Sequence, residues 1–228
     1  MKLLRAVPWF AAAILAAPAF ADKIYVFYPS MAKPNVVQAA LQAKLAGHEV
    51  TVFGRLADFS TMIGQTPPEV IVAPKALADQ FAGYKPFLKG ARKGGPSEEC
   101  VLISTKPVNT AAMATVNLGV VGVLERSAMN GFVQGVVGAQ PKLKIVTKVE
   151  DLLPLLTFGS ADAVLVGETQ VDELKGRSQA ALQTTPVAGS KIGLVVAASK
   201  GDASNVEAAL KGLGAAEKKM LGVDAWIK

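Results

Sequence analysis

Arg126 and Ser127 stand where an apolar, strand-like run meets a helix-like segment, in the sequence LGVVGVLERSAMNGF. A helix that begins there offers unpaired backbone N–H groups and a partial positive charge at its N-terminus. The Arg126 guanidinium can present two N–H donors to an oxyanion, and Ser127 can add its hydroxyl. We therefore predict binding of a carboxylate, phosphate or phosphonate at this junction, with Ser30 and Lys33 forming a matching arrangement from the first part of the chain. The alternative is that Ser127 only caps the helix and that Arg126 pairs with Glu125 or with solvent.

Four more side chains follow predicted strands and are candidates for ligand contact: Tyr28, Arg55, Glu168 and Thr169. Tyr28 could stack on a ligand or hydrogen-bond to it, and its alternative is packing in the core. Arg55 either lines the binding site or is a solvated loop residue. Glu168 could bind an amino group or Arg126, while the alternative for Thr169 is a helix N-cap.

The sequence offers no constellation for catalysis or for a metal ion. His48 is the only histidine and Cys100 the only cysteine, so a zinc site built from His and Cys is excluded by count. Cys100 lies in an apolar strand-like run, and His48 lies in a helix-to-strand turn where we expect a surface side chain. No G-x-S-x-G elbow is present, and residues 28–35 lack the glycines of a dinucleotide-binding loop. We therefore expect neither enzymatic activity nor a cofactor.

The first 21 residues, MKLLRAVPWFAAAILAAPAFA, have the composition of a secretory signal peptide. A positively charged start is followed by a short apolar run and a small-x-small site, which predicts cleavage after Ala21 and a mature chain in the periplasm. Without two of its 24 basic residues, the mature chain would carry 22 basic and 18 acidic residues, a net charge of +4. That charge is diffuse and is not interleaved with aromatic residues, so nucleic acid is not an expected partner.

Alternating strands and helices must position the candidate side chains. The alternation has the spacing of parallel βαβ units, and the strands are near-continuous apolar runs, as in sheets covered on both faces. Predicted strands cover residues 23–29, 48–54, 69–74, 100–106, 118–125, 142–149, 161–168, 179–187 and 191–199. Predicted helices cover residues 34–47, 58–63, 75–84, 127–139, 150–160, 169–176 and 203–214.

This pattern predicts an α/β fold with two open-sheet lobes, a central cleft and two hinge crossings between the lobes. The weakly structured segments 105–115 and 184–186 are the expected crossings. The last strand and helix return to the first lobe. Lobe one is therefore predicted to comprise residues 22–104 plus 188–228, and lobe two residues 105–187 including the hinge segments. In such folds ligands lie beyond the carboxyl ends of the strands.

Three runs carry a family resemblance: KIYVFYPSMAKPNVVQAAL, LGVVGVLERSAMNGF and, above all, VEDLLPLLTFGSADAVLVGE. In the last of these, Leu152, Gly159, Asp162 and Ala163 occupy positions of the pattern xLLxxLxxGxxDA, and Leu155 directly precedes its third leucine. Together with the signal peptide, the runs resemble the type II periplasmic solute-binding proteins that feed ABC transporters. Among the subfamilies, the chain looks most similar to the phosphate/phosphonate-type receptors.

The resemblance implies a function as well as a fold. A protein of this kind closes its two lobes on a small solute, here expected to be anionic (phosphate- or phosphonate-like, or a carboxylate). It would deliver that solute to an inner-membrane ABC permease and would act as a monomer. The alternative is that the same fold serves as a non-transport interaction or sensory protein of the cell envelope.

Overall fold

The computed structural model describes residues 22–228, and the predicted signal peptide lies outside the described residues. The strands are β1 Lys23–Phe27, β2 Glu49–Phe53, β3 Val70–Pro74, β4 Lys85–Ala91, β5 Ser97–Ser104, β6 Asn117–Val121, β7 Lys142–Val146, β8 Ala163–Gly167, β9 Gln183–Gly193, β10 Val195–Ser199 and β11 Ala225–Ile227. The α-helices are α1 Pro34–Lys44, α2 Leu56–Gln65, α3 Lys75–Ala78, α4 Arg126–Val137, α5 Leu152–Thr157, α6 Val171–Arg177, α7 Ser204–Lys211 and α8 Ala215–Met220. Short 3-10 helices are η1 Thr110–Thr115, η2 Val149–Asp151 and η3 Glu168–Gln170.

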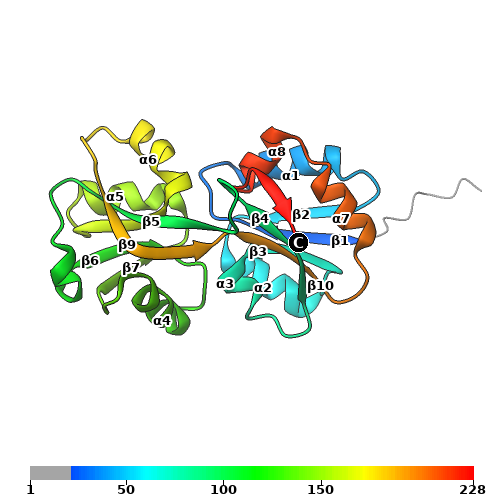
Figure 1. The fold of residues 1–228 in the computed structure, drawn as a ribbon, viewed down its shortest axis with the longest axis horizontal. Helices are drawn as coiled ribbons and strands as arrows, with labels where there is room; N and C mark the ends of the chain where they lie inside the picture. Colours follow the sequence, from blue (N-terminus) through cyan, green and yellow to red (C-terminus); the bar gives the residue numbers. More distant parts are fainter. Residues whose placement is uncertain (1–21) are drawn as a thin grey trace, which may run out of the picture.

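Lobe one is built on a six-stranded sheet with the strand order β11-β4-β10-β3-β1-β2. β1 is parallel to both of its neighbours, β2 and β3, whereas β10 is antiparallel to β3 and β4. Helices α1, α7 and α8 cover one face of this sheet, and α2 and α3 cover the other (Figure 1). Because successive side chains of a strand point to opposite faces, Ile24 and Val26 join the core on the α1 face, and Tyr25 and Phe27 join the core on the α2 face.

Lobe two lies beside lobe one and is built on a five-stranded sheet with the order β7-β6-β8-β5-β9 (Figure 1). β6 is parallel to β7 and β8, and β5 is antiparallel to β8 and β9. Helix α4 covers one face, where Met129 and Val133 are fully buried, and α5 and α6 cover the other, where Leu152 and Leu174 are fully buried. The predicted α/β class with two open-sheet lobes is confirmed.

The crossings between the lobes differ from those expected from the sequence. The chain leaves the first sheet after β4 and enters the second at β5, so the outward crossing is residues 92–96. It returns through Leu194, between β9 and β10. The two crossings are neighbours, because Ser97 of β5 pairs with Gly193 of β9. The expected crossing at 105–115 is instead an internal connection of lobe two.

The sheets therefore divide the chain at other positions than 104 and 188. Residues 97–104, expected in lobe one, form a strand of the lobe-two sheet. The break between strands expected at residues 188–190 is absent, because β9 runs through these residues. Its pairing with β5 shifts register there. Residues 187–190 of β9 lie opposite Cys100 alone, because Lys191 pairs with Glu99 and Pro186 pairs with Val101; a bulge of this kind bends a strand without ending it.

Several other elements also differ from the expectation. Strand β4 lies in a segment for which no element was predicted, and α8 and β11 follow the last predicted helix. Helix α3 has 4 residues, fewer than predicted. The glycines of α4 do not mark a close approach to the sheet, because a Cβ atom at Gly131 or Gly135 would meet no atom within 4 Å outside the backbone of its own helix. Within residues 22–228, no helix is both long enough and hydrophobic enough to span a membrane.

Candidate functional site

A pocket of about 110 Å³ lies between the lobes, where the carboxyl ends of four strands meet. Tyr28 follows β1 and Pro74 ends β3, both in lobe one, whereas Val121 ends β6 and Gly167 ends β8, both in lobe two. This is where open α/β sheets place their ligands. The lining of this interlobe pocket comprises Tyr28, Pro29, Pro74, Ala76, Glu98, Cys100, Val120, Val121, Val123, Met129, Phe132, Val133, Leu165, Val166, Gly167, Gln170, Ile192, Gly193, Leu194 and Val195.

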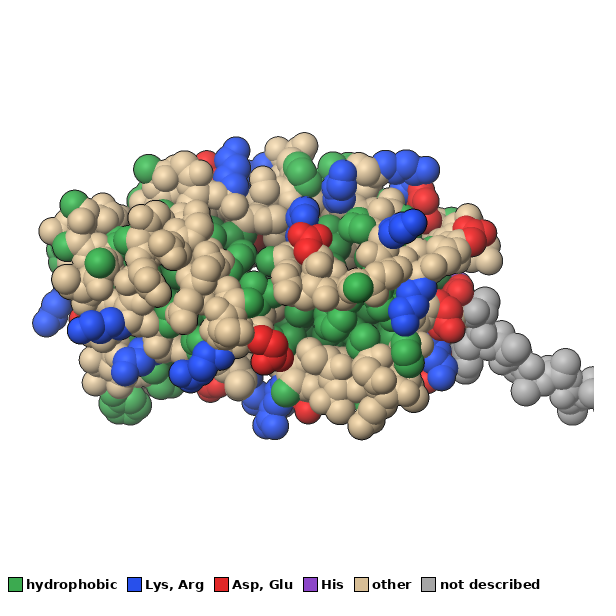
Figure 2. Space-filling model, turned by 90° about the horizontal axis from the view of Figure 1, so that it is seen from below, with side chains coloured by type: hydrophobic (Ala, Val, Ile, Leu, Met, Phe, Trp, Pro, Cys, Tyr) green, Lys and Arg blue, Asp and Glu red, His purple; other side chains and the backbone are tan. Residues whose placement is uncertain are grey.

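The walls of the interlobe pocket are mainly hydrocarbon. Helix α4 contributes Met129, Phe132 and Val133, which share one face of the helix because they are spaced three and four residues apart. Ala76 of α3 closes the pocket from lobe one. On the side of the molecule that bears α4, α2 and α3, hydrophobic side chains are visible in the hollow between the lobes, and Lys and Arg side chains are scattered over this face (Figure 2).

The polar end of the pocket is formed by Tyr28, Glu98 and Gln170. The Glu98 carboxylate accepts two hydrogen bonds from Thr169, one from the backbone N–H (2.9 Å) and one from the hydroxyl (3.3 Å). The Gln170 side chain donates to the backbone carbonyl of Pro29 at 3.0 Å, so it ties lobe two to lobe one across the pocket. These contacts leave the pocket with one hydrogen-bonding end and an otherwise apolar interior.

Burial governs the protonation of this polar end. It raises the pKa of the Tyr28 phenol to about 12, and the Glu98 charge adds to the shift while the Thr169 hydroxyl opposes it. Burial also raises the pKa of the Glu98 carboxyl, against the two hydrogen bonds from Thr169 and the charge of Arg92, which lower it. Both groups are therefore harder to ionise than in water, and a ligand that stabilises the Glu98 carboxylate would offset part of that cost.

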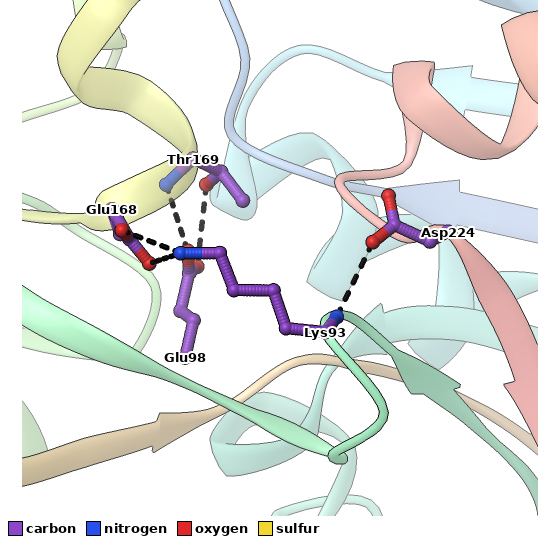
Figure 3. A network of polar contacts seen from close by, with 5 residues as sticks. All are labelled: Lys93, Glu98, Glu168, Thr169 and Asp224. Atoms are coloured by element: carbon purple, nitrogen blue, oxygen red, sulfur yellow. Dashed lines mark hydrogen bonds and ion pairs between the residues drawn. The ribbon is translucent and has the colours of Figure 1, made fainter.

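A second set of polar contacts joins the outward crossing to both lobes (Figure 3). The Lys93 ammonium donates to the two oxygens of Glu168 in lobe two, at 2.7 and 2.8 Å. The Lys93 backbone N–H donates to Asp224 of lobe one at 3.3 Å. Lys93 has a φ of 48°, in the left-handed region that non-glycine residues adopt uncommonly, within the tight turn closed by Arg92 and Gly95. The turn thereby directs its lysine toward Glu168.

Gly167 is required for the position of the Glu98 carboxyl. A Cβ atom at this residue would overlap the Glu98 carboxyl oxygens. Without a side chain at the end of β8, the carboxyl can lie against the β8–η3 backbone and reach the Thr169 N–H. Gly222 has the same relation to the Tyr28 hydroxyl and also has a φ of 70°.

A separate groove of about 390 Å³ lies between the loop after β1 and the segment after β7. Lobe one contributes Ser30 and Lys33, and lobe two contributes Lys148 and Glu150. Lys148 and Glu150 are 3.8 Å apart. This lysine groove carries the basic side chains that the interlobe pocket lacks in its lining.

The structure separates the residues that were predicted to act together. Tyr28 lines both the interlobe pocket and the lysine groove, whereas Ser30 and Lys33 line only the groove. Arg126 and Ser127 are exposed in the first turn of α4 and are not among the lining residues of either cavity.

Of the alternative roles considered for the junction, the described chain shows only the exposure of Arg126 to solvent. The N-cap position of α4 is held by Glu125, and no side chain caps the helix. Among the described residues, no ion pair joins Arg126 to Glu125. Arg55 occupies the N-cap position of α2, is exposed, and lies outside both linings.

The other two predicted residues surround the polar end of the pocket. Glu168 pairs with Lys93, and Thr169 holds Glu98 instead of capping a helix. Sequence reasoning missed Glu98 because residues 93–99 were interpreted as a surface loop. Its position two residues before the apolar run that starts at Cys100 could have placed it on a strand, but that signal does not distinguish Glu98 from Glu99.

The single cysteine and the single histidine do not form a reactive pair. Cys100 lines the interlobe pocket, and burial raises the pKa of its thiol to about 11, so the nucleophilic thiolate is disfavoured. His48 was expected at the surface but is buried, with its Nδ1 atom 3.2 Å from a carboxylate oxygen of Asp22. Among residues 22–228, no three His, Cys, Asp or Glu side chains are grouped to hold a metal ion.

Comparison with known proteins identifies the fold. No family model and no curated protein matches the sequence, whereas many solved structures match the fold. The VFT2 domain of BvgS from Bordetella pertussis has a TM-score of 0.57 and 13% identity, covering 87% of this chain and 90% of that one. The substrate-binding protein of an amino acid ABC transporter has a TM-score of 0.55 and 13% identity, covering 87% and 96%. A variant of ArgBP from T. maritima has a TM-score of 0.55 and 14% identity, covering 87% and 92%. The fold is therefore that of the type II periplasmic binding proteins.

Proposed function

We propose that this chain is an exported solute-binding protein whose two lobes enclose a small, mainly apolar solute in the interlobe pocket. The observation that supports this proposal is the convergence of β1, β3, β6 and β8 on one pocket lined from both lobes. A ligand held there contacts both lobes at once and favours their closed arrangement. We place the hinge motion at the two crossings, residues 92–96 and Leu194, because they connect the two sheets.

The sequence predicted an anionic solute, phosphate- or phosphonate-like or a carboxylate, and the pocket favours another class. Its lining includes one acidic side chain, Glu98, and no basic side chain among the described residues. An anion enclosed there would lose its hydration without gaining a cationic partner, which is costly. An apolar body, in contrast, gains from burial against Val123, Met129 and Phe132.

The resemblance to binding proteins of ABC transporters supports the rest of the proposal. We propose that the protein works in the periplasm as a monomer and presents its solute to an inner-membrane ABC permease. The fold is shared with the substrate-binding protein of an amino acid ABC transporter, and no cofactor, nucleic acid partner or enzymatic step forms part of this function.

A second candidate function is anion binding in the lysine groove. Ser30 and Lys33, both predicted from the sequence, face Lys148 of lobe two across this groove. A phosphate, phosphonate or dicarboxylate bridging the two lysines would also contact both lobes. The two candidates differ in ligand class and in the residues on which binding depends.

A thermal-shift screen with matched variants tests the proposal. The panel contains small apolar alcohols and amines, amino acids, phosphate, alkylphosphonates, sulfate and dicarboxylates. We expect an apolar compound at about 100 times its dissociation constant to stabilise the protein by ~2.7 kcal/mol, or roughly 5–10 °C for a chain of this length.

Three variants locate the binding site. Ala76→Leu fills the interlobe pocket and should abolish the shift, and Ala111→Leu at an exposed position of η1 should retain it. Lys33→Gln should affect binding only if the ligand lies in the lysine groove. A shift that survives in Ala76→Leu, or that is confined to anions and lost in Lys33→Gln, would contradict the pocket assignment. A panel without any shift in the wild type would favour the envelope interaction or sensory alternative.

A further inference from the structure

Glu98 is the one charged side chain in the described lining of the interlobe pocket. It lies at the start of β5, directly beyond the outward crossing, and it also lines a hollow on the outside of that crossing. The carboxyl therefore separates the apolar interior from a charged surface region that contains Arg92, Lys93 and Glu168.

No cation compensates this carboxyl within the described part of the chain. The nearest basic residues are otherwise placed: Lys93 pairs with Glu168, and Arg92 lowers the Glu98 pKa without coming within the 4.0 Å of an ion pair. Carboxylates removed from water are normally paired with a cation or saturated with hydrogen bonds. Glu98 has only the two hydrogen bonds from Thr169 among the described residues.

The carboxylate retains unused acceptor capacity. A carboxylate offers about four lone-pair positions. Thr169 donates its backbone N–H to one oxygen and its hydroxyl to the other, so each oxygen keeps one position. The Gln170 amide does not fill them, because its N–H donates to Pro29.

The rest of the pocket limits the size and polarity of the remainder of a cationic ligand. The apolar walls include Val120, Phe132 and Leu165. In another protein an apolar cavity of about 150 Å³ holds benzene, and this pocket has about 110 Å³. An alkyl chain of a few carbons or a small ring is therefore the largest body that fits without the lobes moving apart.

We propose that Glu98 is the specificity-determining residue of the interlobe pocket and that it receives the protonated amino group of a small apolar amine. The inference rests on the proposed function and names the class of its solute. The ammonium group can donate to the free acceptor position on each oxygen of Glu98, and its hydrocarbon part lies against the α4 face of the pocket. A hydrogen bond between two charged groups is roughly twice as strong as one between neutral groups.

Matched ligands and matched variants test this assignment by isothermal titration calorimetry. The probes are n-butylamine and 1-butanol, which share a short alkyl chain and differ in the group that would face Glu98. We expect the wild type to bind the amine at least tenfold more tightly than the alcohol. Glu98→Gln should reduce that preference to less than threefold while it still binds the alcohol, and its thermal unfolding confirms that it folds.

Glu99→Gln is the control, because it makes the same change of charge at the next residue, which is exposed and outside the pocket lining. It should keep the preference of the wild type. Equal affinities of the wild type for the two probes, or an undiminished preference in Glu98→Gln, would overturn the amine assignment and leave pocket binding intact. Binding of neither probe would also overturn it. Different results would contradict the proposed function itself: no panel compound raises the unfolding temperature of the wild type, or the increase persists in Ala76→Leu.

Discussion

At the residue scale, the behaviour of the site depends on the half-buried carboxyl of Glu98, which has no ion-pair partner among the described residues. Burial favours the neutral form of Glu98, while Thr169 stabilises the charged form. Gly167 allows this arrangement because any side chain there would occupy the place of the carboxyl. Ionising Glu98 in the unliganded protein therefore costs free energy, and the amino group of a ligand can offset that cost.

The stability of the unliganded protein should fall as Glu98 ionises. Its pKa is raised in the folded state, so its contribution to the free energy of unfolding is fully present below the unfolded-state pKa of about 4.3. That contribution is lost as the pH rises through the folded-state pKa. We expect Glu98→Gln and the wild type to unfold at similar temperatures near pH 4, and the variant to unfold at a temperature higher by a few degrees at pH 8.

Thermal unfolding from pH 4 to pH 9 checks this prediction, with Glu99→Gln as the control for the change in net charge. The groups that influence or face the Glu98 carboxyl are Tyr28, Arg92, Cys100, Glu168 and Thr169. A difference between variant and wild type that does not grow with pH would contradict the burial of an ionisable Glu98.

The sequence could supply Tyr28, Glu168 and Thr169 as candidates, because each directly follows a recognisable strand. It could not supply Glu98, because its role depends on how β5 crosses between lobes. It also could not show that Arg126 lies outside both cavities. A helix N-terminus fixes where an anion can bind, but which face of α4 meets the other lobe is set by tertiary packing.

At the scale of elements, helix α4 could be made more stable by replacing glycines in its interior. Gly131 and Gly135 lie within the helix, and a Cβ atom at either position would meet open space. A helical glycine costs roughly 0.5–1 kcal/mol relative to alanine. We expect Gly131→Ala and Gly135→Ala each to raise the free energy of unfolding by about that amount, measured by urea denaturation.

Gly119 of β6 is the matched control. A Cβ atom there would come within 2.8 Å of Val164 and 2.9 Å of Leu155. Gly119→Ala should therefore destabilise the protein, by roughly 1–3 kcal/mol. Equal effects of the α4 and β6 substitutions would contradict the packing described for these two elements.

Apolar periodicity predicted most of the elements, and it failed where the strands cross between lobes. Strand β4 begins with the exposed residues Lys85 and Pro86 and has exposed Lys89 in its interior, so it lacks a continuous apolar run, and proline is disfavoured within strands. In β9, Gly189 has a φ of 72°, and the strand continues past it with pairing to β5 on both sides of a register shift. Crossing strands of this kind are stabilised by partners distant in sequence, so local patterns do not locate them.

At the scale of the whole molecule, few side-chain hydrogen bonds join the two lobes. Gln170 donates to Pro29 across the mouth of the pocket, and the ion pair of Lys93 with Glu168 joins the crossing to lobe two. In that pair the two side chains are 68% and 42% exposed, so its contribution to closure is small. Closure around a solute therefore depends more on the pocket contacts and on Gln170.

Gln170→Ala should weaken the affinity for the solute. It removes one hydrogen bond between the lobes, worth about 0.5–1.5 kcal/mol, which corresponds to a roughly two- to tenfold increase in dissociation constant. Titration with the compound that gives the largest thermal shift measures the change. Gln134→Ala on the exposed side of α4 is the control and should leave the affinity unchanged. Equal affinities of the two variants would show that the Gln170–Pro29 contact does not contribute to closure.

The most direct test of solute binding between the lobes is a crystal structure of the protein with that compound bound. We predict that the compound lies between Ala76 of lobe one and Phe132 of lobe two, with its polar group within hydrogen-bond distance of Glu98. A compound ordered in the groove between Lys33 and Lys148, with the interlobe pocket filled only by its own side chains, would contradict the account.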